Sequence, residues 1–162
     1  MLPRFFVVVF FAGLMTLQAA TIILVRHAEK AGPMGDVPLS EAGVKRAALL
    51  AKMLAQSKVT AIYTSEYMRT KSTAAPLAQL LSIEPGTFSA SDVDGLVSVL
   101  KAAPLNAVIL VVTHSDRLPI LAERLGVTVK PVAETEYSRL LILNVSGANT
   151  TSITLRFGEI LE

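Results

Sequence analysis

Two short runs of branched apolar residues, each followed by a histidine, constrain this chain most. Residues 22–25 read Ile-Ile-Leu-Val, and residues 107–112 read Ala-Val-Ile-Leu-Val-Val. Such runs predict strands buried on both faces, as in a parallel sheet covered by helices. Because ligands of these sheets gather at the carboxyl ends of the strands, we expect the only two histidines, His27 and His114, at one edge of the sheet. Arg26 adds a guanidinium, which binds oxyanions, so the pattern indicates phosphate chemistry.

The first 20 residues have the order of a secretory signal peptide. One basic residue, Arg4, precedes an apolar stretch at residues 5–17 and a small-residue end at Ala19 and Ala20. The apolar core of about 13 residues is shorter than the roughly 20 that a spanning helix needs. We therefore expect cleavage after residue 19 or 20, with an uncleaved anchor as the alternative. Either arrangement places residues 21–162, a single domain, in the periplasm or outside the cell.

Composition excludes several classes of function. Fifteen basic and 13 acidic residues give a net charge of only +2, and the basic residues are scattered singly, which argues against nucleic acid as a partner. The chain has no cysteine, which excludes disulfides, thiolate metal sites and a cysteine nucleophile. No run after the leader is long and apolar enough to span a membrane, so we expect no membrane span in the mature chain.

Helical and extended patterns alternate along the rest of the chain. Ser40 and Ser65 are expected to cap helices over residues 41–55 and 66–81, and further helices are expected at 93–101 and 117–125. The first helix is expected to bury Val44, Ala47, Ala48, Ala51, Leu54 and Ala55. Strands are expected at 61–63, 139–144 and 152–157. This order predicts a three-layer α/β/α sandwich with a mostly parallel sheet, mixed if the last two strands pair antiparallel.

Four motifs in register resemble those of the histidine phosphatase superfamily, which includes the phosphoglycerate mutases. They are Leu-Val-Arg-His-Ala-Glu-Lys at 24–30, Pro-Leu-Ser-Glu-Ala-Gly at 38–43, Tyr-Thr-Ser-Glu-Tyr-Met-Arg-Thr at 63–70 with Thr-Ala at 73–74, and Val-Thr-His-Ser at 112–115. The resemblance covers essentially all of the mature chain and suits a small secreted member of bacterial type. It departs from the usual pattern at Ala28, where relatives often have glycine.

The resemblance implies a metal-independent phosphatase that needs no cofactor. His27 would attack phosphorus and carry the phosphoryl group, while Arg26, Arg69 and His114 would hold its oxygens. The chemistry agrees, because two guanidiniums and an imidazole can stabilise the negative charge of a phosphoryl group in transfer. The implied partner is a phosphorylated small molecule or a protein-borne phosphate.

The residue that protonates the leaving group has no clear match. Relatives place a carboxylic acid between the second arginine and the second histidine, or directly after that histidine. The first interval offers Glu84, Asp92 and Asp94, whereas the second histidine is followed by Ser115 and then Asp116. We take Asp116 and Glu29 as candidates for the general acid. Without an acid, a readily departing group such as a phosphohistidine would be favoured, because acid catalysis contributes about 100-fold or more.

Three alternatives remain open at this point. A metal-dependent hydrolase could use His27, His114, Asp116 and Glu29, although metal-ligand spacing is missing and nearby arginines would repel a cation. A non-catalytic phosphate-binding module could share the same fold. A mutase would need insertions that enclose and reorient a substrate, for which the compact chain offers little room.

Overall fold

A six-stranded sheet forms the centre of the computed structural model, which describes residues 19–147 and 149–158. Its elements, in chain order, are β1 (Ala20–Arg26), α1 (Glu41–Leu54), β2 (Ala61–Ser65), α2 (Met68–Leu81), β3 (Gly86–Phe88), α3 (Val93–Lys101), β4 (Val108–Thr113), α4 (Arg117–Arg124), β5 (Arg139–Ser146) and β6 (Asn149–Arg156). Residues 1–18 of the predicted signal peptide lie outside the described residues, and Ala20 already belongs to β1.

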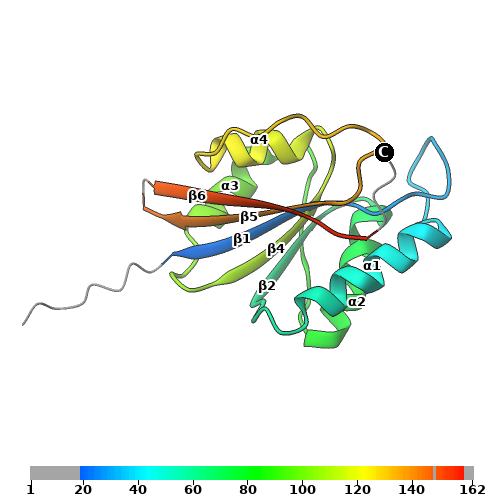
Figure 1. The fold of residues 1–162 in the computed structure, drawn as a ribbon, viewed down its shortest axis with the longest axis horizontal. Coiled ribbons are helices and arrows are strands. Elements are labelled where there is room, and N and C mark those ends of the chain that lie inside the picture. Colours follow the sequence, from blue (N-terminus) through cyan, green and yellow to red (C-terminus); the bar gives the residue numbers. More distant parts are fainter. Residues whose placement is uncertain (1–18, 148, 159–162) are drawn as a thin grey trace, which may run out of the picture.

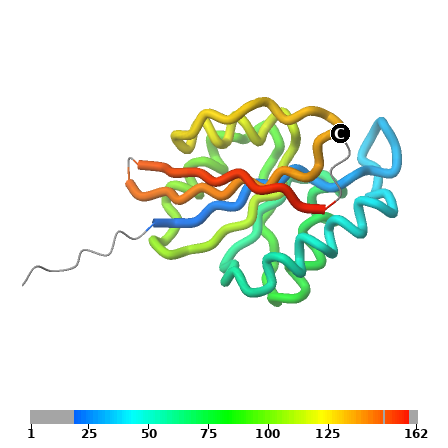
Figure 2. Tube along the Cα trace, in the orientation of Figure 1, coloured from blue at the N-terminus to red at the C-terminus, as the bar shows by residue number. Residues whose placement is uncertain are grey.

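The strands follow the order β3-β2-β4-β1-β5-β6 across the sheet (Figure 2). The first four are mutually parallel, whereas β5 runs antiparallel to β1 and β6 antiparallel to β5. The sheet is therefore mixed, and the predicted α/β/α sandwich is confirmed. Strand β3 is an addition to the predicted strands, because its three residues are too few to show a pattern in the sequence.

Helices cover both faces of this sheet (Figure 1). On one face, α3 and α4 pack against Ile22 and Leu24 of β1, and on the other, α1 and α2 pack against Ile23 and Val25. All four of these side chains are at most 3% exposed. Burial on both faces explains why β1 has a continuous apolar run rather than alternating polarity.

The buried face of α1 differs in part from the predicted one, since Ala47, Ala51 and Leu54 are buried as expected but Val44 and Ala48 are not. Ser40 caps the helix as expected, because its Oγ accepts a hydrogen bond of 3.1 Å from the Gly43 amide. Val44 is 57% exposed and Ala48 is exposed, while Gly43 and Arg46 are buried. A Cβ on Gly43 would lie 2.1 Å from the carbonyl oxygen of Glu29. Because Gly43 has no side chain, α1 can approach the Glu29 backbone closely, and Arg46 is on the buried side of the helix.

The start of α2 also differs from the prediction, because Ser65 does not cap it. The helix begins at Met68, whose amide donates a hydrogen bond of 2.8 Å to the Asp36 carboxylate in the loop between β1 and α1. Ser65 Oγ instead contacts Thr70 Oγ1 at 2.9 Å and His114 Nε2 at 3.0 Å. A side chain expected to serve local structure thus belongs to the histidine cluster.

The described residues include no helix that is both long and apolar enough to cross a membrane.

Candidate active site

The pairing of β1 with β4 brings the two histidines together. Arg26 is opposite Thr113 in this parallel pair, so His27 and His114 leave the sheet side by side. The His27 amide donates a hydrogen bond of 2.9 Å to the Thr113 carbonyl. The imidazole ring centroids are 5.4 Å apart with their planes at 64°, which gives an edge contact.

An open depression of about 390 Å³ lies at this edge of the sheet. It contains the four predicted catalytic residues together with residues from five loops and from the start of α4. The full lining is Arg26, His27, Lys30, Tyr67, Arg69, Ala90, His114, Ser115, Asp116, Arg117 and Glu134. Cationic and imidazole groups outnumber the two carboxylates in this lining, which suits an anionic ligand.

The hydrogen bonding of His27 leaves one ring nitrogen free. Nδ1 is 2.7 Å from the Ala28 carbonyl oxygen, which can only accept, so Nδ1 carries the proton. The Ala28 amide is itself fixed by a hydrogen bond of 2.9 Å to Thr73 Oγ1. A neutral His27 therefore has its lone pair on Nε2.

Burial and neighbouring charges keep His27 neutral. The residue is 3% exposed, and its burial lowers its pKa to about 4, assisted by the positive charges of Arg26 and Arg69. The hydrogen bond to Ala28 opposes this shift. At neutral pH the imidazole thus has the unprotonated nitrogen that a nucleophile requires.

Ser65 and Tyr67 fix the position of the His114 ring. Its Nε2 contacts Ser65 Oγ at 3.0 Å, and the edge-on ring of Tyr67 lies 5.4 Å away between centroids. Burial, followed by the charge of Arg69, lowers the pKa of His114 to about 4. Among the described residues its Nδ1 has no partner, so this nitrogen is the one available to a ligand.

The two arginines are fixed differently. The guanidinium of Arg26 lies 4.2 Å from the Tyr137 ring centroid and binds the loop before β5. The guanidinium of Arg69 lies 4.1 Å from the Tyr67 centroid and 3.8 Å from Asp36. Each has a buried Nε without a hydrogen-bond partner in the described part of the chain. Unpaired buried donors are costly, which is the condition expected of a site built for an anion.

The two predicted acids are placed very differently. Asp116 lines the depression, and its side chain is 65% exposed beside Arg117. Glu29 does not line it, because its carboxylate accepts hydrogen bonds of 2.9 Å and 2.7 Å from Nε and Nη2 of Arg46 on α1. The structure therefore brings Asp116, but not the Glu29 carboxylate, into the site.

The other acidic residues between the second arginine and the second histidine have structural partners or lie elsewhere. Asp92 caps α3 through the Gly95 amide, and Asp94 pairs with Arg124 at 2.7 Å. Glu84 lines a separate groove beside α2.

Glu134 is the carboxylate that sequence reasoning missed. It lines the depression, and its Oε2 is 2.7 Å from Nη2 of Arg26, which is 108 residues earlier in the chain. No local motif marks this residue. Its position follows from the strand order, because the loop from α4 to β5 must return to the strand beside β1.

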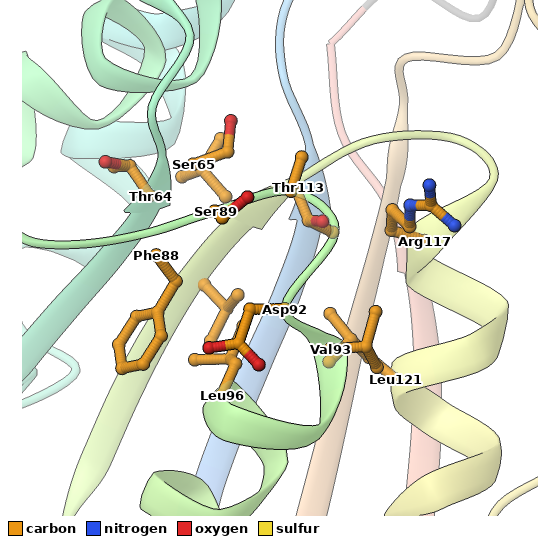
Figure 3. Close-up of a pocket in the computed structure, with 13 residues that line it drawn as sticks. Thr64, Ser65, Phe88, Ser89, Asp92, Val93, Leu96, Thr113, Arg117 and Leu121 are labelled. Carbon is orange, nitrogen blue, oxygen red and sulfur yellow. The ribbon is translucent and has the colours of Figure 1, made fainter.

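A second cavity, of about 20 Å³, lies between α3 and the ends of β2 and β4 (Figure 3). Ala90 and Arg117 line both this cavity and the depression, so the two adjoin. Its volume suits one water molecule and is too small for a substrate. The open depression is therefore the candidate active site.

Residues 19–147 and 149–158 contain no group of three or more histidine or acidic residues arranged to hold a metal ion. The two histidines lie instead between guanidiniums, whose charge disfavours a bound cation.

Comparisons with known proteins find relatives in sequence motif and in fold. Residues 22–89 match the model of the histidine phosphatase superfamily (branch 1), a segment that includes His27 and Arg69. A structure of the protein histidine phosphatase SixA complexed with tungstate is 19% identical with a TM-score of 0.68, over 84% of this chain and 96% of that one. A putative alpha-ribazole-5'-P phosphatase from Escherichia coli is 16% identical with a TM-score of 0.72, over 86% of this chain and 97% of that one.

A mycobacterial glucosyl-3-phosphoglycerate phosphatase in complex with VO3 is 16% identical with a TM-score of 0.65, over 85% of this chain and 98% of that one. No curated protein sequence matches. At these identities the solved structures show the shared fold. Together with the family model over residues 22–89, they confirm the resemblance to the histidine phosphatase superfamily.

Proposed function

We propose that this chain, with its match to the histidine phosphatase superfamily, hydrolyses phosphorylated compounds through a phosphohistidine intermediate on His27. One observation carries the proposal. His27 is buried and neutral, with Nδ1 bound to the Ala28 carbonyl and Nε2 left free, inside a depression that also contains Arg26, Arg69 and His114. This is the arrangement required of a nucleophile that accepts a phosphoryl group.

The reaction proceeds in two displacements. In the first, Nε2 of His27 attacks phosphorus and the leaving oxygen departs. Arg69 and the free Nδ1 of His114 stabilise the charge on the equatorial oxygens, and Arg26 contributes once its guanidinium turns from the loop to the phosphoryl group. In the second, water attacks the phosphohistidine and releases phosphate together with neutral His27.

The substrate class follows from the openness of the site. A depression of about 390 Å³ on the surface admits a small phosphorylated molecule or a phosphorylated side chain of another protein. The fold neighbours include a protein histidine phosphatase and two phosphatases of small phosphorylated molecules. We propose that the substrate is a phosphomonoester or another phosphorylated compound. A substrate screen that includes small phosphorylated molecules and a phosphorylated protein distinguishes the two sources of the phosphoryl group.

The order of residues 1–20 supports a secreted or periplasmic enzyme whose mature domain spans residues 21–162. In this proposal the first strand begins directly after the leader, so processing removes no part of the catalytic fold beyond the first residue of β1.

Hydrolysis of p-nitrophenyl phosphate by the chain from Thr21, with EDTA present, tests the proposal. We expect turnover that resists EDTA and is abolished in His27→Ala, while the circular dichroism spectrum of the variant stays that of the wild type. Full activity in His27→Ala would overturn the mechanism. Loss of wild-type activity on chelation would favour a metal-dependent hydrolase, and vanadate binding without turnover would favour a phosphate-binding module.

A further inference from the structure

The loop before β5 closes around the guanidinium of Arg26. Its Nη1 donates hydrogen bonds to the carbonyl oxygens of Ala133 at 3.0 Å and Glu134 at 2.7 Å. Its Nη2 donates to the Glu134 carboxylate at 2.7 Å, and the Tyr137 ring stacks on the guanidinium. This loop therefore holds Glu134 against the first residue of the predicted phosphate site.

The Glu134 carboxylate spans two groups of the depression. One oxygen pairs with Arg26, and the other accepts a hydrogen bond from the Ser115 hydroxyl, next to His114. The Arg26 side chain is 2% exposed, whereas that of Glu134 is 78% exposed. The carboxylate is thus fixed by Arg26 and Ser115 while it stays open to solvent.

The attacking and leaving atoms lie in line in phosphoryl transfer, and this requirement places the leaving oxygen on the side of the Glu134 carboxylate. The leaving oxygen must lie opposite the attacking Nε2 of the buried His27, and so towards the mouth of the depression. Glu29 faces Arg46 instead, so Glu134 and Asp116 are the described carboxylates that line the site. In the described part of the chain Asp116 pairs with Arg117 and forms no hydrogen bond with Arg26, Arg69 or His114. Glu134, by contrast, binds Arg26 directly.

We propose that Glu134 is the catalytic residue that protonates the leaving group and then deprotonates the attacking water. This inference rests on the proposed function of His27. In the first displacement the Nε2–P bond forms, the P–O bond to the leaving group breaks, and the Glu134 proton passes to the leaving oxygen. In the second, a water oxygen bonds to phosphorus, the Nε2–P bond breaks, and the water proton returns to Glu134.

A change of partners lets one carboxyl group serve both steps. In the free protein the hydrogen bond from Ser115, and then the charge of Arg26, hold the pKa of Glu134 below its usual value against the opposing effect of burial. A phosphoryl dianion competes for Arg26 and places negative charge beside the carboxylate. Both effects favour the protonated form of Glu134 when substrate is bound.

The dependence on the leaving group tests this assignment. We compare Glu134→Gln with the wild type on an alkyl phosphate and on p-nitrophenyl phosphate, whose leaving group needs no proton. We expect turnover of the alkyl phosphate to fall about 100-fold or more. The burst of p-nitrophenol that reports phosphorylation of His27 should change less than about tenfold, since a departing nitrophenolate needs little acid help. Glu123→Gln, on the exposed surface of α4, is the matched control.

Three results would overturn the assignment. One is an equal loss, on the two substrates, in the rate at which Glu134→Gln phosphorylates His27, because the acid step is the one that depends on the leaving group. Another is the loss of orthovanadate binding in that variant, which would mean that Glu134 only orders Arg26. The third is an alkyl-selective loss in Asp116→Asn instead. Failure of the proposed function is separate, because it would appear in the wild type as turnover that survives His27→Ala.

Discussion

His27 combines a fixed tautomer with a low basicity, and both come from its immediate surroundings. The Ala28 carbonyl fixes the proton on Nδ1, and burial lowers the pKa to about 4. An exposed histidine would be partly protonated near pH 6.5 and would lose its nucleophile there. His27 therefore stays neutral throughout the pH range in which a phosphomonoester gains its second negative charge.

The two histidines allow a direct test by nuclear magnetic resonance. Because their pKa values are lowered to about 4, both rings should stay neutral as the pH falls through 6.5 and should become protonated only near pH 4. The ring proton shifts of the chain from Thr21 report this, and His114→Gln assigns the two signals. Titration of the His27 signal near pH 6.5 would contradict the burial and the charges described for it.

Among single residues, those whose positions are set by the end of a buried strand could be predicted from the sequence. Arg26, His27 and His114 follow directly from buried strands, and the structure brings them together with Arg69. The sequence did not predict which partners the acidic side chains bind. Glu29 follows the nucleophile by two residues but turns to Arg46, because Gly43 lets α1 approach the Glu29 backbone.

At the scale of elements, α1 serves as a support for the nucleophile's loop. The backbone amide and hydroxyl of Ser40 donate to the Glu29 carbonyl, at 2.9 Å and 3.3 Å, while Arg46 binds the Glu29 carboxylate. Arg46 Nη1 also donates to the Phe157 carbonyl at 2.9 Å, just after β6. A helix and the end of the last strand thus fix the segment that follows His27.

Arg46→Met should therefore destabilise the fold strongly. The Arg46 and Glu29 side chains are 8% and 15% exposed, so removing the guanidinium leaves a mostly buried carboxylate without its main partner. We expect a loss of about 3 kcal/mol or more in the free energy of unfolding, measured by urea denaturation. The double variant Glu29→Gln with Arg46→Met should lose less than the sum of the two single losses. A loss below about 1 kcal/mol in Arg46→Met would contradict a buried pair, since exposed pairs contribute that little.

Element boundaries were predictable where a cap and an apolar period agree. The helix predicted over residues 93–101 matches α3, which Asp92 caps. The predicted start of α2 was wrong, because the first amide of the helix donates its hydrogen bond to Asp36, which is 32 residues away, rather than to the neighbouring Ser65. Long-range partners of this kind leave no signal in a local window of sequence.

At the scale of the whole molecule, the strand order is what assembles the site. Placing β1 between β4 and β5 sets His27 beside His114 on one side and brings the loop before β5 to Arg26 on the other. Alternating strands and helices predicted the sandwich, but not this order. Glu134 lay beyond sequence reasoning for the same reason, because its role depends on which strand the chain returns to.

If phosphate passes through His27, the intact protein carries a phosphoryl group during turnover. The wild-type chain from Thr21 is mixed with p-nitrophenyl phosphate, quenched in alkali within the first turnover, and analysed by intact and fragment mass spectrometry. We expect one acid-labile phosphoryl group on the fragment that contains His27, and none in His27→Ala. Steady turnover with no phosphorylated protein at any quench time, or a phosphoryl group on another residue, would contradict it.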